Sequence, residues 1–132
     1  MTSPKDFSHL DLAARNFIQA KMFGADLTQA DLRTANLYQA NLTNADLRSA
    51  QLLDADLSGA QLAGANLTVA NLRSANLLAA NLRLTNLCRA DLTGADLTRA
   101  DLTHANLTGA DLTGANLTDV IMPEGWKLVR DE

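Results

Sequence analysis

Leucine occupies every fifth position of this chain from Leu27 to Leu117, over nineteen consecutive positions. Alanine stands two residues before each of these leucines, with Thr85 the only exception. The residue directly before each leucine is Asp or Asn, except at Gln51 and Gln61. A spacing this strict limits the chain to folds in which the same environment returns every five residues.

A five-residue period fits neither an α-helix nor a straight strand. On a helix, residues five apart differ by about 140° around the axis, so the leucines would cover every face. On a straight strand, side chains alternate, so residues five apart would point to opposite faces. Both conflicts disappear if Ala30-Asp31-Leu32 is extended, with Ala30 and Leu32 on one face, and if Arg33-Thr34 turns a corner before the next repeat. The period therefore predicts a solenoid.

The string ADLTQADLRTANLYQANLTNADL, from Ala25 to Leu47, resembles the tandem A-[DN]-L-x-x motif of the pentapeptide-repeat proteins. The resemblance implies an all-β fold, a right-handed quadrilateral β-helix with one pentapeptide per side and four per coil. Looser repeats before Ala25 and one after Leu117 bring the expected number of coils to about six. We expect residues 1–5 to form a leader, 6–119 the β-helix, and 120–132 a C-terminal cap.

The composition agrees with a single core built from Leu and Ala, because 47% of the residues are hydrophobic and only 4% are aromatic. At the one exceptional inward position, we expect the Thr85 hydroxyl to bond a nearby backbone carbonyl. Six of the seven glycines stand at the last position of a repeat, where a corner can require a positive φ. The interior is therefore expected to be almost entirely hydrocarbon.

The rows of Asp and Asn admit a catalytic and a structural interpretation. General acid–base chemistry or metal binding needs particular carboxylates at particular places, whereas Asp and Asn interchange freely along these rows. Short polar side chains beside a corner commonly bond the neighbouring backbone instead. We favour this structural role, and we interpret the threonines that follow the leucines, such as Thr93, as β-formers on a solvated wall.

No residue pattern indicates an enzyme. His9 and His104 lie near opposite ends of the expected rod, and Cys88 is the only cysteine, which fits a reducing compartment. Glycine-rich phosphate loops, a signal peptide and a membrane span are absent from the sequence. We therefore expect no catalytic, cofactor-binding or metal site, and a cytoplasmic location.

The chain ends differ from the repeat. An open terminal coil exposes unpaired backbone and a cross-section of Leu and Ala, which is a template for end-to-end association. At the C-terminus Pro123 removes a backbone donor. We predict a cap formed by Met122, Trp126 and Leu128, in which Trp126 folds over the last coil and seals it.

Any specific recognition must lie on the outer surface. Positions twenty apart share a side, which places Ile18, Tyr38 and Leu78 on one side and Phe23 on the next. Ile18, Phe23 and Tyr38 would form an exposed apolar group. This group is either ordinary surface or, if contiguous, a site for dimerisation or partner docking.

Charge varies along the rod, although the net charge is −4. Residues 57–90 hold no acid and three arginines (Arg73, Arg83 and Arg89), between two acidic ends. This basic waist (residues 57–90) is either unselected variation on a solvated surface or a site for an acidic partner. Three dispersed arginines are too few for a nucleic-acid site.

These patterns predict a non-catalytic structural or interaction module, a rigid rod that presents its outer faces to an unidentified protein partner, as a monomer or weak homodimer. No cofactor, direct nucleic-acid contact or membrane contact is expected. The alternative is a DNA-mimic inhibitor of gyrase or a self-resistance protein, which a resemblance to the quinolone-resistance pentapeptide proteins allows. The modest net charge and the basic waist weigh against it.

Overall fold

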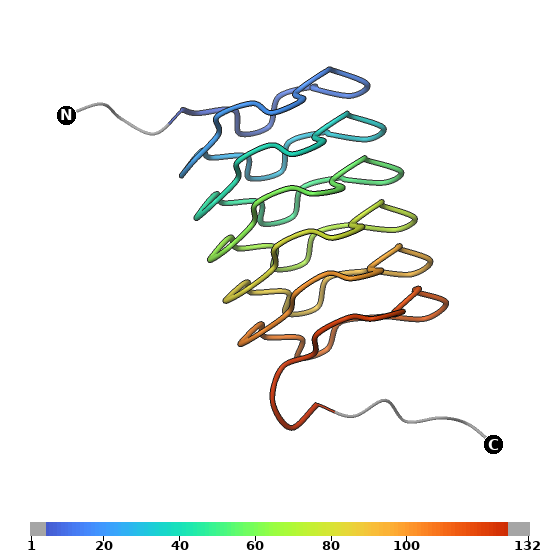
Figure 1. The fold of residues 1–132 in the computed structure, drawn as a ribbon. Coiled ribbons are helices and arrows are strands. Elements are labelled where there is room, and N and C mark those ends of the chain that lie inside the picture. Colours follow the sequence, from blue (N-terminus) through green and yellow to red (C-terminus); the bar gives the residue numbers. More distant parts are fainter. Residues whose placement is uncertain (1–4, 127–132) are drawn as a thin grey trace.

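The computed structural model describes residues 5–126, which wind into a right-handed, four-sided β-helix of six coils (Figure 1). On one side the six levels are linked by successive parallel bridges, which join Asp6, Asp26, Asp46, Asn66, Asn86 and Asn106. Every bridge joins residues twenty apart, from Asp6↔Asp26 to Asp101↔Ile121. The predicted fold, with four pentapeptides per coil, is confirmed.

The described residues contain no helix and no strand longer than one bridged residue. Most sides are the triplet Ala-Asx-Leu, and the middle residue of each side makes the bridge. The Asp46 N–H donates to the Ala25 carbonyl at 2.9 Å, and the Asp46 carbonyl accepts from the Leu27 N–H at 2.7 Å. The middle residue of a side therefore directs both backbone groups toward the preceding coil.

The corners are tight turns of uniform geometry. In one of them the Ala30 N–H donates to the Leu27 carbonyl at 3.0 Å, and Gln29 has φ 57°. A positive φ at the third residue alone is the signature of a type II turn. Every last-position residue from His9 to Asp119 has a positive φ, glycine or not. The expectation for the six glycines is confirmed, but the corner imposes the same conformation on all other residue types.

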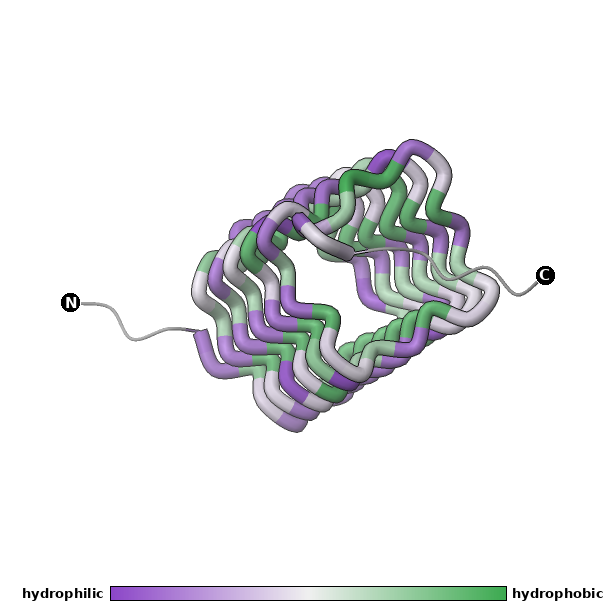
Figure 2. Tube along the Cα trace, turned by 90° about the horizontal axis from the view of Figure 1, so that it is seen from below, coloured by the Kyte–Doolittle hydropathy of each residue, from purple (hydrophilic) through white to green (hydrophobic). Residues whose placement is uncertain are grey.

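The core is a column of Leu and Ala side chains. All register leucines from Leu27 to Leu102 are fully buried, and the alanines between them are buried as well. Seen along the axis, the coils superpose as a four-sided frame (Figure 2). The buried Leu and Ala side chains form one cluster inside this frame. Buried Thr85 donates its hydroxyl to the Leu82 carbonyl at 2.7 Å, as predicted.

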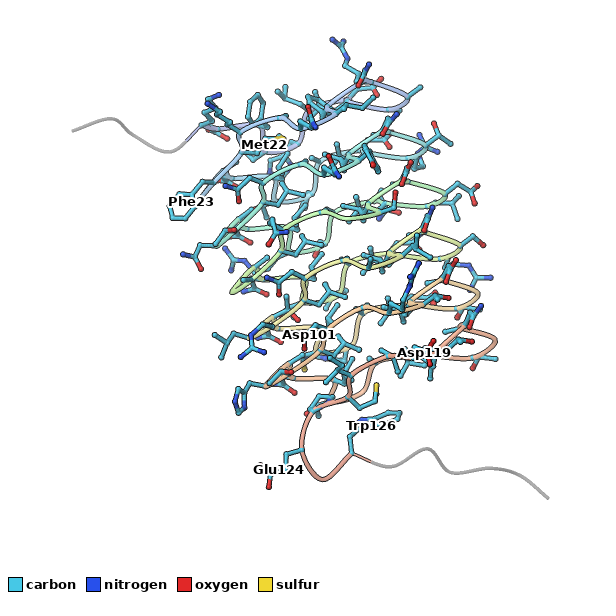
Figure 3. All side chains as sticks on the ribbon, viewed as in Figure 1. Met22, Phe23, Asp101, Asp119, Glu124 and Trp126 are labelled. Carbon is cyan, nitrogen blue, oxygen red and sulfur yellow. The ribbon has the colours of Figure 1, made fainter. Side chains whose placement is uncertain are left out.

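Burial decreases at both ends of the rod. Phe7 and Phe17 in the first coil and Leu112 and Leu117 in the last are only partly buried. After Ile121 the chain leaves the last coil and passes beneath it (Figures 1 and 3). No helix among residues 5–126 has the length and apolarity to cross a membrane.

Candidate interaction surface

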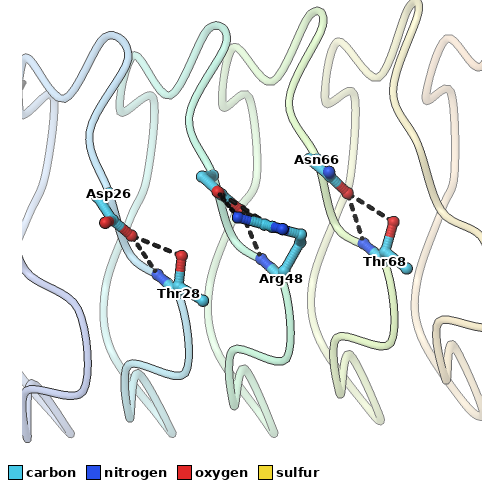
Figure 4. Close-up of polar contacts among 6 residues, drawn as sticks. Asp26, Thr28, Arg48, Asn66 and Thr68 are labelled. Carbon is cyan, nitrogen blue, oxygen red and sulfur yellow. Dashed lines mark hydrogen bonds and ion pairs between the residues drawn. The ribbon is translucent and has the colours of Figure 1, made fainter.

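The Asp and Asn side chains are built into the corners. Each Asp or Asn of this register from Asp6 to Asn116 accepts, through Oδ1, a hydrogen bond from the backbone N–H two residues later, at 2.9–3.2 Å. Asp26 and Asn66 make this bond with the same geometry (Figure 4). The carboxylate charge is not needed for it, which is why Asp and Asn interchange. The predicted structural role of this register is confirmed.

The threonines complete the same turns. A Thr or Ser hydroxyl that directly follows the leucine register donates to the same Oδ1 at 2.5–2.7 Å, as Thr68 does to Asn66 (Figure 4). The interpretation of Thr93 as a β-former on a wall is wrong in position, because Thr93 is the first residue of a corner. These hydroxyls hold the corner and are therefore occupied.

The two glutamines of this register act between coils instead. The Gln51 Oε1 accepts from the Asn71 Nδ2 at 3.1 Å, and the Gln61 Oε1 accepts from the Asn81 Nδ2 at 3.1 Å. Their longer side chains reach the equivalent position one coil later. These contacts add polar cohesion along the rod and do not gather reactive groups.

At several corner carboxyls, hydrogen bonds lower the pKa below its ordinary value. The hydrogen bond from the Arg33 side chain lowers the pKa of Asp31, and the hydrogen bond from the Thr98 hydroxyl lowers the pKa of Asp96. A catalytic acid or base working near neutrality needs a pKa close to 7. Both carboxyls are shifted in the opposite direction, so they serve as stable anions in the corners.

The residues able to bind metals or act as nucleophiles are dispersed. His9 and His104 are exposed corner residues in the first and fifth coils, and Cys88 is a half-buried corner residue whose N–H donates to the Asn86 Oδ1 at 3.0 Å. Within residues 5–126, no three His, Cys, Asp or Glu side chains form a group that could hold a metal ion.

Two arginines of the basic waist form ion pairs with aspartates of the coil that follows it. The Arg73 Nη1 lies 3.2 Å from the Asp91 Oδ2, and the Arg83 Nη1 lies 3.2 Å from the Asp101 Oδ2. Arg89 makes no ion pair with any other described residue. Two of the three waist guanidiniums therefore have a partner within the chain. The i to i+18 spacing, one coil less two residues, is the sequence signal that could have revealed these pairs.

The exposed apolar group is divided between two corners. Ile18 and Tyr38 occupy equivalent positions of one corner in successive coils and are 44% and 41% exposed. Phe23 projects from the next corner and is 63% exposed (Figure 3). Leu78, on the Ile18 corner, is half-buried and is separated from Tyr38 by Ser58. The sequence pattern assigned these residues to flat sides, whereas residues that directly follow the leucine register stand at corners.

The C-terminal segment lies against the last coil. Met122 and Trp126 are partly buried and pack on the hydrophobic core. Trp126 lies beneath the last coil (Figure 3), and its backbone N–H donates to the Pro123 carbonyl at 3.1 Å. Leu128, the third residue of the predicted cap, lies outside the described residues. Whether this segment seals the rod against association stays a prediction.

Two exposed apolar residues were not singled out as surface features from the sequence. Leu10 is 46% exposed and Ile121 is 54% exposed. Leu10 stands in the register of the small residue, and Ile121 stands in the Asx register. Each lies in a terminal coil, so departures from the repeat could have identified both.

Known proteins share this architecture. The family described as Pentapeptide repeats matches residues 11–48, 50–87 and 80–119, in eight copies. The chain is 34% identical to the pentapeptide repeat protein Rfr23 from the cyanobacterium Cyanothece 51142, over 90% of this chain and 88% of that one, with a TM-score of 0.56. It is 37% identical to the pentapeptide repeat protein alr5209 from Nostoc PCC 7120, over 66% and 77% of the two chains, with a TM-score of 0.58.

A third solved structure is more distant in shape. HetL, a pentapeptide repeat protein involved in heterocyst differentiation regulation in Nostoc sp. strain PCC 7120, is 32% identical over 92% of this chain and 78% of that one, with a TM-score of 0.35. Among curated proteins, none matches this chain by sequence. The family match spans most of the coils described above, so the chain belongs to the pentapeptide-repeat family.

Proposed function

We propose that this protein is a non-catalytic interaction module, a rigid rod that presents its outer surface to a protein partner. The observation that carries the proposal is how the polar groups are used. The Asp and Asn side chains directly before the leucine register and the Thr and Ser side chains directly after it are engaged in turns, and the interior is filled with Leu and Ala. The positions that can still vary in sequence are therefore the corner residues on the outer surface. This favours a recognition surface over a catalytic site.

The Ile18 corner is the leading candidate for the partner surface. Ile18 and Tyr38 replace the Thr or Ser that this corner carries at Ser58, Thr98 and Thr118. They forgo the hydroxyl bond to the Asx oxygen and expose apolar surface in its place. A broader surface would add the remaining candidate residues, namely Phe23, Leu78, Arg73, Arg83 and Arg89.

Replacing this apolar surface with the residue usual at the corner tests the proposal. In the double variant Ile18→Thr/Tyr38→Thr, each threonine can bond the Asn Oδ1 two residues earlier, so the fold is expected to persist. A partner retained from host lysate by the wild type should be lost with this variant. Leu84→Asn, which removes an exposed apolar residue from a different corner in a distant coil, is the matched control.

The expected result is a protein bound by the wild type and by Leu84→Asn and not by the double variant. If no bound protein distinguishes the double variant from the control, the Ile18 corner is not the partner surface. If no protein is retained by any form, the interaction-module proposal itself fails.

The charge distribution does not favour the DNA-mimic alternative. A DNA mimic needs continuous negative charge along the rod, whereas the waist lacks acids and directs Arg73 and Arg83 onto Asp91 and Asp101. We expect gyrase supercoiling to be unaffected at a stoichiometric amount of this protein. Clear inhibition, or protection from a quinolone, would favour the alternative.

A further inference from the structure

The first coil departs from the repeat in favour of large apolar residues. All three phenylalanines of the chain, Phe7, Phe17 and Phe23, lie in it. Leu10 stands where the next coil has the fully buried Ala30. Because Leu10 is 46% exposed, the first coil holds more apolar side chain than it can bury by itself.

The same coil presents an open backbone edge. In the second coil, the Asp26 N–H donates to the Lys5 carbonyl at 2.8 Å, and the Asp26 carbonyl accepts from the Phe7 N–H at 2.7 Å. The equivalent groups of the first coil have no backbone partner among residues 5–126. Each side of the end therefore offers one donor and one acceptor from a single residue, in turn Asp6, Asp11, Asn16 and Lys21.

This edge suits a second copy that meets it head-on. In an antiparallel hydrogen-bonded pair, two facing residues exchange both their N–H···O=C bonds. When a two-fold axis perpendicular to the rod relates the two copies, both remain right-handed. The facing sides of their end coils then run in opposite directions, so they are antiparallel. The middle residues of the two end coils then have the orientation that such pairs need, on all four sides.

Charge distinguishes the arrangements that symmetry allows. A four-sided end admits four such axes, two through opposite sides and two through opposite corners. Three of them place like charges together: Asp6 on Asp6, Asp11 on Asp11, or Asp6 on Asp11. The fourth places Lys21 opposite Asp6 and Asp11 opposite Asn16, each twice, with no like-charged pair.

The fourth arrangement also pairs the apolar residues. With Asp11 facing Asn16, antiparallel register places Leu10 opposite Phe17 of the other copy. With Lys21 facing Asp6, the same register places Ala20 opposite Phe7. Partly exposed apolar side chains of each copy are thereby brought against those of the other, which a hydrophobic contact requires.

From this edge and its charges we propose that the protein forms an isologous dimer through its N-terminal ends, with Lys21 of each copy beside Asp6 of the other. Closed two-fold pairing consumes both N-terminal edges and ends the assembly at two copies. Head-to-tail stacking is disfavoured because the C-terminal segment, with Trp126, packs against the opposite end of the rod.

Sedimentation velocity over a concentration series tests the dimer. The full-length chain is expected to approach 28.2 kDa, twice its 14.1 kDa, as concentration rises. Leu10→Ala restores the residue usual in the repeat, so it should leave the melting temperature within a few degrees and raise the dimer Kd about tenfold or more. Leu84→Asn, at a distant corner, is the control and should leave the Kd unchanged.

A charge swap tests the arrangement. Lys21→Asp fits the Asx register and can bond the Phe23 N–H as its equivalents do, but it faces Asp6 of the other copy and should raise the Kd about tenfold. Lys21→Asp combined with Asp6→Lys restores opposite charges and should recover the wild-type Kd. Gln61→Asp, on the same side two coils away, should have no effect.

A mass that stays at 14.1 kDa up to several hundred micromolar would overturn the proposal. So would a dimer that tolerates Leu10→Ala and Lys21→Asp equally well. A dimer weakened by Lys21→Asp and weakened further by Asp6→Lys would reject the Lys21–Asp6 pairing.

Discussion

At the scale of single residues, the fold makes the same conformational demand at every corner. The last residue of each repeat adopts a positive φ, which is strained for β-branched side chains. Val69 has φ 61° and Thr34 has φ 59°, whereas Asn44 meets the same demand at 59° with a residue that tolerates it. Side-chain choice at these corners therefore affects stability without changing the path of the chain.

Val69→Asn is expected to stabilise the protein by about 1 kcal/mol, because Asn adopts positive φ at lower cost than Val. Val69 is an exposed corner residue, so little buried surface is lost. Urea unfolding of the two proteins measures the difference. Val69→Ala, which removes the β-branching alone, should give a smaller gain. A variant less stable than the wild type would show that Val69 is not strained.

The Asx register also predicts a specific response to acid. Hydrogen bonds from Thr98 hold the pKa of Asp96 below its ordinary 3.8. The stabilisation is therefore fully present above about pH 4 and is lost as the pH falls through the lower pKa of the folded state. Asp96→Asn keeps an Asx oxygen, as in the Asn66–Thr68 turn, but does not titrate.

The free energy of unfolding of Asp96→Asn should therefore fall less steeply than that of the wild type below pH 4. The two proteins should behave alike near neutrality. Urea titrations between pH 2.5 and 7 make the comparison. Identical slopes in acid would mean that Asp96 gains no hydrogen-bonding advantage from folding.

At the scale of the coil, burial depends on position along the rod. Leu67 lies in a middle coil and is fully buried, whereas Leu112 in the last coil is partly exposed. Each coil is bonded to its neighbours by backbone bonds on four sides, so the frame has little freedom to collapse around a cavity. The same substitution should therefore cost different amounts in different coils.

Leu67→Ala is expected to destabilise the protein by about 2 to 5 kcal/mol, because removal of the side chain leaves a cavity in a frame that cannot contract. Leu112→Ala should cost less, since part of that side chain already contacts solvent. Equilibrium unfolding in urea gives both values. Equal costs at the two positions would argue against a continuous core with open ends.

The coil is also the level at which the sequence was most informative. The period predicted the inward Leu and Ala and the corner at Arg33-Thr34, because both follow from which side chains must share an interior. The twenty-residue coil was an expectation from the family resemblance, since the five-residue period does not set the number of sides. Ile18 and Phe23 were placed on two neighbouring sides, whereas each directly follows the leucine register and therefore stands at a corner, as Arg33 does.

Other features of the surface depend on geometry that no local pattern contains. The Arg73–Asp91 pair joins a corner of one coil to a side of the next, so it requires the rise between coils and the reach of the arginine. The positive φ of Val69 runs against the preference of the residue, and only the repeated corner imposes it. At the C-terminus the repeat is broken, and the path of the chain there follows from packing of Met122 and Trp126.

At the scale of the whole molecule, the rod has two unlike ends. The C-terminal end is crossed by a segment whose Trp126 packs on the core, whereas the N-terminal end carries exposed Leu10 and Phe23. Solenoids need protected ends because an open coil is a template for another coil. The two ends therefore govern association, while the sides between them are available to a partner.

Trp126→Ala should uncover the last coil and promote reversible end-to-end association. Combined with pairing at the N-terminal ends, it should produce species larger than a dimer. Sedimentation velocity detects them, and thermal melting reports the lost contact. A variant whose mass distribution and melting match those of the wild type would count against a capping role for Trp126.

The whole fold depends on a four-walled coil that closes every twenty residues around Leu and Ala. A crystal structure is the most direct measurement. It should show Leu27, Leu47 and Leu67 stacked in one column inside the rod, with the middle residues of successive coils about 4.8 Å apart. Leucines that face solvent, or a chain that is mainly helical, would contradict it.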